Sequence, residues 1–185
     1  MPTLVTSYNA TLAGSVDARA RDALTWTIAF RPQALSIYLR FQERGTINTA
    51  SGDALHLGNS GFTGARLLLR VASGAYRFFH NNGYSEVTAT PGSSPTVGQW
   101  VELVLRLGAN GAVSVVQSIN GATATTTSDS AALTIAAAWG GTTLAVGDQI
   151  AGGSGGAIGL SHLVIVRGVH DLTAMRKYAA TKPVT

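Results

Sequence analysis

The chain has 185 residues, of which 45% are apolar and only 12% are charged, and it carries 22 glycines. That length favours a single domain, and so few charges beside so many glycines are typical of a β protein with tight turns. The net charge is +4, with 11 arginines and 2 lysines, but there is no run rich in basic residues, and Arg19, Arg31, Arg40, Arg66, Arg77, Arg106 and Arg167 are dispersed singly among apolar strands. This argues against a nucleic-acid-binding protein.

Several kinds of segment are missing from the sequence. There is no cysteine, which excludes disulfides and thiolate metal sites. No apolar run approaches the roughly 18 residues of a membrane-spanning helix. The first 14 residues lack the basic start and apolar core of a signal peptide. We therefore expect the protein to fold in a cytoplasm.

The first 21 residues are mostly polar and are predicted to form an arm or an edge segment, ahead of one domain at residues 22–185. The first strands of that domain are expected at residues 24–31 and 35–42, where apolar and polar side chains alternate. In the second strand, the side chains expected inside are Leu35, Ile37, Leu39 and Phe41, and those expected outside are Ser36, Tyr38, Arg40 and Gln42. A period of two predicts strands that bury one face, as in antiparallel sandwiches.

Further strands follow at short spacing, without helices between them. They are predicted at residues 54–57, 66–71, 75–80, 84–90, 99–107, 113–119, 122–127, 144–146 and 157–167. Asn-Gly pairs at residues 82–83, 110–111 and 120–121 indicate tight hairpin turns. About eleven strands connected in this way predict an all-β fold with two antiparallel sheets packed face to face.

One helix is expected, near the C-terminus. It begins at Asp171, whose carboxylate can accept hydrogen bonds from the free N–H groups of the first turn. Leu172, Met175 and Tyr178 form a single apolar stripe at helical spacing. A short amphipathic helix needs a surface to lie on, and we expect that surface to be the rim of a sheet.

The order of these signals has a parallel in a known family. A Gly-x-Trp at residues 98–100 precedes a long strand, a Gly turn follows at residues 120–121, and a later strand ends at Gly147 before a glycine-rich loop, a strand and the helix. This order resembles that of the laminin-G-like family. The resemblance implies a concanavalin-A-type jelly roll with two antiparallel sheets and one short C-terminal helix. The absence of cysteine departs from secreted members, which often carry a disulfide.

The resemblance also implies where a calcium ion would lie, because laminin-G-like domains often hold one Ca²⁺ near the sheet rim. Asp53 and Asp148 are the two matching positions. Ca²⁺ takes about 6–8 oxygen ligands, and the sequence places too few carboxylates nearby for a tight site. We therefore predict turn-forming aspartates there, with no metal and no other cofactor.

The sequence shows no set of catalytic residues. Members of the family that hydrolyse β-glucans carry two glutamates and an aspartate alternating on one strand, which places two carboxylates on one face. Here Glu43, Glu86 and Glu102 each stand alone. The four histidines also lack the spacing of metal ligands. We predict a protein that is not an enzyme.

Two functions of different classes are open, and the preferred one is structural. A cytoplasmically folded chain without cysteine, with a nearly uncharged exterior and no catalytic set, is typical of a bacteriophage virion component that decorates the capsid or the tail surface. Its partners would be the major capsid protein, a tail protein or copies of itself, and it would lie on the virion surface after synthesis in the host cytoplasm. The expected contact residues are Leu4, Val5, Tyr8, Arg40 and Arg77.

The alternative is a glycan-binding module for adhesion or receptor recognition. Such modules need exposed aromatic rings for the sugar faces and planar polar groups for the hydroxyls. The tract at residues 76–84 combines both around a predicted hairpin tip, and its candidate contacts are Tyr76, His80, Asn81 and Tyr84.

Overall fold

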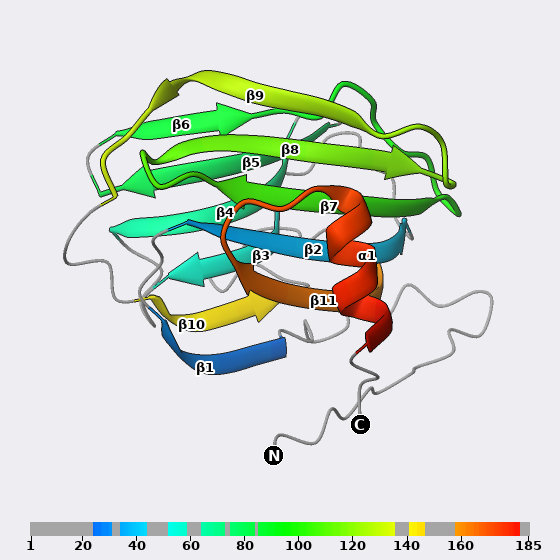
Figure 1. Cartoon of the computed structure of the whole chain (residues 1–185), viewed down its shortest axis with the longest axis horizontal. Coiled ribbons are helices and arrows are strands. Elements are labelled where there is room, and N and C mark those ends of the chain that lie inside the picture. The colour runs from blue at the N-terminus through cyan, green and yellow to red at the C-terminus, as the bar shows by residue number, and fades with distance from the viewer. Residues whose placement is uncertain are drawn as a thin grey trace, which may run out of the picture.

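The computed structural model describes residues 24–30, 34–43, 52–58, 64–72, 75–83, 85–135, 141–146 and 158–181. Within these ranges the chain forms two β-sheets stacked face to face and one helix, α1 (Leu172–Thr181) (Figure 1). The fold is therefore all-β with one short C-terminal helix, as predicted. The predicted arm at residues 1–21 lies outside the described residues. No helix in the described part of the chain is long and apolar enough to span a membrane.

Both sheets are antiparallel throughout their described pairings. The six-stranded sheet has the order β1 (Leu24–Phe30), β10 (Gly141–Val146), β3 (Gly52–Gly58), β4 (Ala65–Ala72), β5 (Ala75–Asn82) and β6 (Glu86–Ala89). The five-stranded sheet has the order β11 (Ile158–Arg167), β2 (Leu35–Glu43), β7 (Trp100–Leu107), β8 (Ala112–Ile119) and β9 (Thr125–Ala132).

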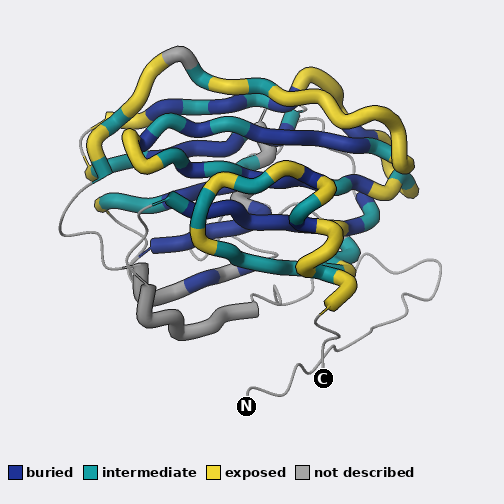
Figure 2. Tube along the Cα trace, viewed as in Figure 1, coloured by how far each residue is buried: buried dark blue, intermediate teal, exposed yellow. Residues whose placement is uncertain are grey.

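The main core lies between the sheets. Every second side chain of a strand enters it, and in β2 these are the predicted Leu35, Ile37, Leu39 and Phe41, all with 0% exposure. Figure 2 shows buried residues along the middle of the strands, whereas β9 and the outer side of α1 are mostly exposed. Burying one such side chain stabilises the fold by about 1.5–3 kcal/mol, so the alternation of β2 alone specifies which of its faces turns inward.

The helix α1 covers the outer face of the five-stranded sheet (Figure 1). Its buried Leu172 and Met175 pack on Tyr38, Val104 and Val116, which point away from the main core. The expectation that the helix lies on the sheet rim is therefore wrong. The reason is that these strands carry an apolar row on their outer face, and this row needs cover from water.

The start of α1 is fixed by a helix cap and by hydrogen bonds to a serine of the sheet. The Asp171 carboxylate accepts a hydrogen bond from the Ala174 N–H at 2.7 Å, which is the predicted cap. One residue earlier, the His170 N–H donates to the Ser36 hydroxyl at 2.9 Å, and that hydroxyl donates to the Gly168 carbonyl at 2.9 Å. Ser36 is expected to be exposed from the sequence and is instead buried, because the segment at residues 168–170 is bonded to it.

Candidate functional site

An open pocket of about 630 Å³ lies on the outer face of the five-stranded sheet, beside α1. We call it the Trp100 pocket. Its lining comes from β2, β7, β11, the turn between β8 and β9, and the end of α1. The lining residues are Tyr38, Arg40, Trp100, Glu102, Asn120, Gly121, His162, Arg176, Ala179 and Ala180.

The strand register places the polar lining residues in one row. His162 lies opposite Arg40, Arg40 lies opposite Glu102, and Glu102 lies opposite Ser118. Directly opposed residues on one face have Cβ atoms about 4.5–5.5 Å apart, so the row is continuous. The next row toward α1 is the apolar one that the helix covers. The helix thus buries the apolar row, while His162, Arg40 and Glu102 of the polar row line the pocket and Ser118 at its end is buried.

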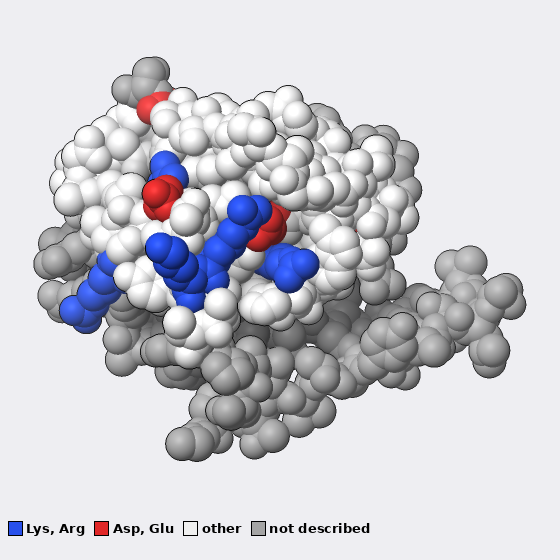
Figure 3. All heavy atoms as spheres, turned by 45° about the vertical axis from the view of Figure 1, so that its right-hand side comes forward, with Lys and Arg blue, Asp and Glu red and all other residues white. Residues whose placement is uncertain are grey.

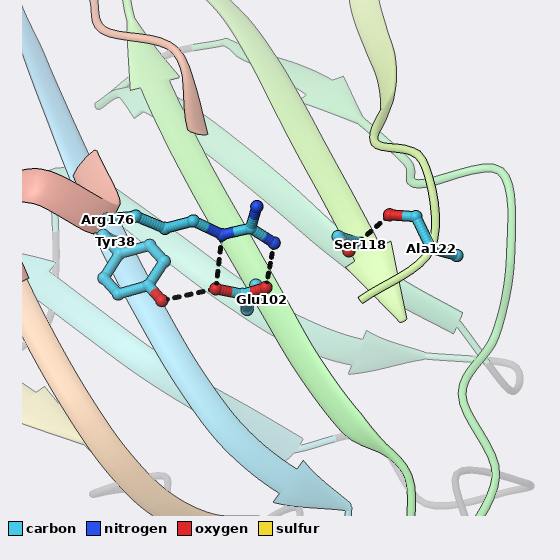
Figure 4. A network of polar contacts seen from close by, with 5 residues as sticks. All are labelled: Tyr38, Glu102, Ser118, Ala122 and Arg176. Carbon is cyan, nitrogen blue, oxygen red and sulfur yellow. Dashed lines mark hydrogen bonds and ion pairs between the residues drawn. The ribbon is translucent and has the colours of Figure 1, made fainter. Parts of the chain in front are cut away.

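The Glu102 carboxylate joins the sheet to the helix (Figure 4). It accepts a hydrogen bond from the Tyr38 hydroxyl at 2.7 Å on Oε1. Arg176 of α1 donates to the same oxygen from Nε at 3.0 Å and to Oε2 from Nη2. Such a two-point pairing of guanidinium and carboxylate is stronger and more directional than a single bond.

These contacts shift the pKa values of Glu102 and of Tyr38, which donates a hydrogen bond to it. The hydrogen bonds from Arg176 lower the pKa of Glu102, and the bond from Tyr38 adds to this, although burial acts in the opposite direction. Burial and the bond to Glu102 raise the pKa of Tyr38. Glu102 is therefore an ionised carboxylate whose two oxygens both accept hydrogen bonds from the protein, and it is poorly suited to donate a proton to a substrate.

Trp100 supplies an exposed aromatic surface, with 39% of the residue accessible. The guanidinium carbon of Arg40 lies 5.0 Å from the centre of its ring, in a cation–π contact. Asn120 fixes the backbone of Trp100 from the neighbouring hairpin. The Trp100 N–H donates to the Asn120 side-chain oxygen at 2.9 Å, and the Asn120 N–H donates to the Trp100 carbonyl at 2.8 Å.

The local turn explains why Asn stands at position 120. Asn120 has a φ of 51° and Gly121 a φ of 77°, which is the backbone of a tight two-residue hairpin turn. Asn and Gly are the residues that adopt this conformation at least cost. The Ser118 hydroxyl donates to the Ala122 carbonyl at 2.7 Å across the same turn (Figure 4). The rim of the pocket is therefore held rigidly next to Trp100.

Charge is sparse and localised on this side of the molecule. Figure 3 shows a few basic and acidic side chains gathered within a surface that is otherwise uncharged. Among the described lining residues, Arg40 and Arg176 are the cations and Glu102 is the one anion. The formal charges of these three residues sum to +1.

The glycan contacts predicted in residues 76–84 do not form a surface site. Tyr76 is 1% exposed and His80 is 0% exposed, so neither can touch a sugar, and both predictions are wrong. The physical reason is that Tyr76, Phe78 and His80 share the inward phase of β5. Asn81 is half-buried and accepts a hydrogen bond from the Gly83 N–H at 2.7 Å as part of the turn. Tyr84 lies outside the described residues.

The two predicted partner contacts that the structure describes, Arg40 and Arg77, lie in separate places. Arg40 lies in the Trp100 pocket, whereas Arg77 is half-buried on β5 of the other sheet. Leu4, Val5 and Tyr8 lie outside the described residues. Of the five predicted residues, the two that the structure describes, Arg40 and Arg77, therefore lie on different sheets and do not share one surface.

The calcium candidates do not form a site that the structure describes. Asp53 belongs to β3, and Asp148 lies outside the described residues. Within the described ranges, no three His, Asp or Glu side chains gather where they could share a metal ion.

Sequence reasoning missed most of the pocket. It placed Arg40 and Tyr38 correctly on the outer face of β2, but it gave no role to Trp100 beyond the family pattern and treated Glu102 as an isolated glutamate. The signal present was the alternation in residues 35–42 and 99–107, which places these side chains on outer faces. The partner of Glu102, Arg176, is 74 residues further along the chain.

No protein-family model matches the chain, and a search of curated proteins finds no match. Among solved structures, the chain is similar to the full-length tailspike protein 2 of an Escherichia coli O157:H7 bacteriophage, with 14% identity and a TM-score of 0.63 over 89% of this chain and 24% of that chain. It is also similar to the Ruminococcus gnavus IT-sialidase CBM40 bound to α2,3-sialyllactose, with 16% identity and a TM-score of 0.55, over 80% of this chain and 83% of that chain. Domains LG4-5 of the mouse laminin α1 chain are 17% identical, with a TM-score of 0.52, over 81% of this chain and 43% of that chain.

At these identities the likeness establishes the fold alone. The chain has the laminin-G-like, concanavalin-A-type jelly roll that its sequence resembles. It spans less than half of the laminin chain and about a quarter of the tailspike chain.

Proposed function

We propose that the chain is a non-catalytic glycan-recognition module and that its sugar binds in the Trp100 pocket. The observation that carries this proposal is an exposed tryptophan, beside an arginine and a hairpin amide, over an open pocket on the outer face of a rigid sheet. Exposed aromatic rings match the apolar faces of sugars, and planar polar groups match the hydroxyls.

The fold is compatible with this role. One structure of the same fold is a sialidase-associated CBM40 domain bound to α2,3-sialyllactose, so this jelly roll supports sugar binding in at least one other protein. The likeness supports the proposal without identifying the sugar, because binding depends on the residues of the site rather than on the fold.

The non-catalytic part of the proposal rests on the carboxylates. Glycoside hydrolysis generally needs two carboxyl groups on either side of the scissile bond. Glu102 is the one carboxylate among the described residues that line the pocket, and it is bound to Arg176 and Tyr38. Incubating the protein with each bound oligosaccharide should release no product, and cleavage would contradict this part.

A glycan array followed by titration of the hits tests the binding proposal. We expect Trp100→Ala to weaken binding tenfold or more, because removing a central aromatic contact has effects on the order of 2 kcal/mol. Tyr178→Ala is a matched control, since Tyr178 is 40% exposed and lies on α1 outside the pocket lining. An array without any binding would refute the proposal, as would equal losses in the two variants.

A second proposal concerns where the module acts: on the surface of a bacteriophage virion, attached to capsid or tail proteins or to copies of itself. The observation that favours it is the similarity to a tailspike domain over 89% of this chain. The largely uncharged surface in Figure 3 is also suited to broad contacts, because few ions need to lose water. Quantitative mass spectrometry of purified particles tests it. We expect a fixed number of copies per particle, and a protein found only free in lysates would contradict it.

A further inference from the structure

We infer that the Trp100 pocket takes a sugar bearing a carboxylate and that Arg40 is the residue that binds this carboxylate. The inference rests on the proposed glycan-binding function and adds the chemical class of the sugar.

The first argument is the charge balance of the pocket. Arg176 directs Nε and Nη2 to Glu102, so the two charges compensate each other. Arg40 is exposed, and among the described residues it forms no hydrogen bond or ion pair. Arg40 lies close enough to act on the charge of Glu102, but two arginines against one glutamate leave a net positive charge where a ligand can reach it.

The second argument is the geometry of Arg40. A guanidinium is planar and offers its N–H groups as a fork that matches both oxygens of a carboxylate. The guanidinium carbon of Arg40 lies 5.0 Å from the centre of the Trp100 ring, which packs against one face of the group. Because the side chain is already ordered by the ring, binding costs less conformational entropy than it would for a free arginine.

The third argument decides between neutral and acidic sugars. A neutral sugar that stacks on the ring face under Arg40 would have to displace the cation from it. A carboxylate binds Arg40 where it already lies, and hydrogen bonds between charged partners are roughly twice as strong as neutral ones. The arrangement of Arg40 on Trp100 thus favours the acidic ligand.

The neighbours of Arg40 complete the site for the rest of the sugar. His162 lies directly opposite Arg40 in the pairing of β11 with β2, and Asn120 stands on the other side, next to Trp100. Both side chains are polar and line the pocket, so they are in position to meet hydroxyl groups around the carboxylate.

The test uses the full chain and matched pairs of oligosaccharides. The acidic probes are oligogalacturonides, hyaluronan fragments and sialylated lactose, each paired with its carboxyl-reduced form, beside a panel of neutral oligosaccharides. We expect binding of at least one acidic probe, a loss of tenfold or more on reduction of its carboxyl group, and weaker binding as salt concentration rises.

Arg40→Gln should remove the preference for the acidic form. Arg167→Gln should retain it, because Arg167 is an exposed arginine on the same sheet that lies outside the pocket lining. Binding of neutral oligosaccharides alone, or equal binding of the acidic and reduced forms, would overturn the inference and leave glycan recognition standing. Binding of no probe at all would overturn both.

Discussion

Tyr76 on β5 and Glu43 on β2 share a hydrogen bond of 2.7 Å that connects the two sheets through the interior. Each residue is only 1% exposed. The ring of Phe41 meets that of Tyr76 edge-on, with centroids 5.4 Å apart. Burial, together with the bond to Glu43, raises the pKa of Tyr76. A carboxyl group in the core is destabilising unless it is hydrogen-bonded, so the tyrosine hydroxyl has a structural role here.

We expect Tyr76→Phe to lower the free energy of unfolding by about 1–3 kcal/mol, because it removes a donor from a buried acceptor while keeping the ring. Urea unfolding measures this, with an unchanged dependence on denaturant. Tyr178→Phe serves as the control, since that hydroxyl belongs to an exposed residue, and it should change stability by less than about 0.5 kcal/mol. Equal effects of the two variants would contradict the role of the Tyr76 bond.

The same pair of residues shows what the sequence could and could not reveal. The alternation of residues 35–42 predicted the buried face of β2, and continuing it by one step places Glu43 inside as well. In β5, however, both phases carry an aromatic side chain, with Tyr76 and Phe78 in one and Phe79 in the other. Periodicity alone does not identify the inward phase of such a strand, so the sequence predicts Tyr76 in a sugar site although its side chain lies in the core.

The pocket could not be predicted from the sequence for a different reason. Its central contacts join Arg40 of β2 to Trp100 of β7, and Glu102 of β7 to Arg176 of α1. The register between strands that are not consecutive in sequence is set by packing of the whole sandwich, not by a local motif. The Asn-Gly turns, by contrast, were readable because a tight turn depends only on its own backbone, although among the described residues Asn120 alone has the positive φ of the two-residue type.

The Asn120 side chain provides a prediction that separates two of its roles. Asn120→Gly keeps the backbone at positive φ but removes the oxygen that accepts the Trp100 N–H. Asn120→Ala also removes the oxygen but keeps a Cβ at positive φ, where an L-residue without the local hydrogen bond of Asn is strained by about 1–2 kcal/mol. We expect stability in urea to fall in the order wild type, Gly, Ala. Both variants should weaken glycan binding, because Trp100 loses its anchor.

Equal stability of the Gly and Ala variants would show that the backbone angle at position 120 carries no strain. Unchanged glycan affinity in both would show that Trp100 keeps its position without the Asn120 oxygen.

Two glycines with similar backbone angles should respond differently to alanine. Gly111 has a φ of 81° and Gly121 a φ of 77°. A Cβ on Gly111 would lie 1.5 Å from the Leu133 carbonyl oxygen, whereas a Cβ on Gly121 would meet nothing within 4 Å. We expect Gly121→Ala to lower the free energy of unfolding by about 1–2 kcal/mol through strain alone. Gly111→Ala should exceed it by at least about 2 kcal/mol, because backbone atoms must also move. Similar losses in urea unfolding would contradict the close approach at Gly111.

The buried histidines predict a loss of stability in mild acid. His56 is 6% exposed. Its burial, and to a lesser degree Arg66 and Arg70, lower its pKa from 6.5 to about 3. Burial also lowers the pKa of His80, although its bond to the Gly111 carbonyl acts in the opposite direction. Both groups therefore remain neutral in the folded protein at pH values where they are protonated in the unfolded chain.

The sign follows from this difference in proton binding. Below pH 6.5 the unfolded chain takes up protons that the folded protein does not bind, so the free energy of unfolding falls as pH falls, by up to about 1.4 kcal/mol per pH unit for each histidine. For His56 the loss extends from about pH 6.5 to about pH 3.

The substitution His56→Gln tests this by urea unfolding at a series of pH values. Between pH 6 and pH 5, we expect the free energy of unfolding of the variant to fall less steeply with pH than that of the wild type, by the equivalent of about one bound proton. Above pH 7.5 His56 is neutral in both the folded and the unfolded wild type, so the difference in free energy of unfolding between the two proteins should be constant there. This constant difference measures the packing effect of the substitution separately from the titration. Parallel curves from pH 7.5 to pH 5 would mean that His56 is protonated in the folded protein as readily as in the unfolded chain.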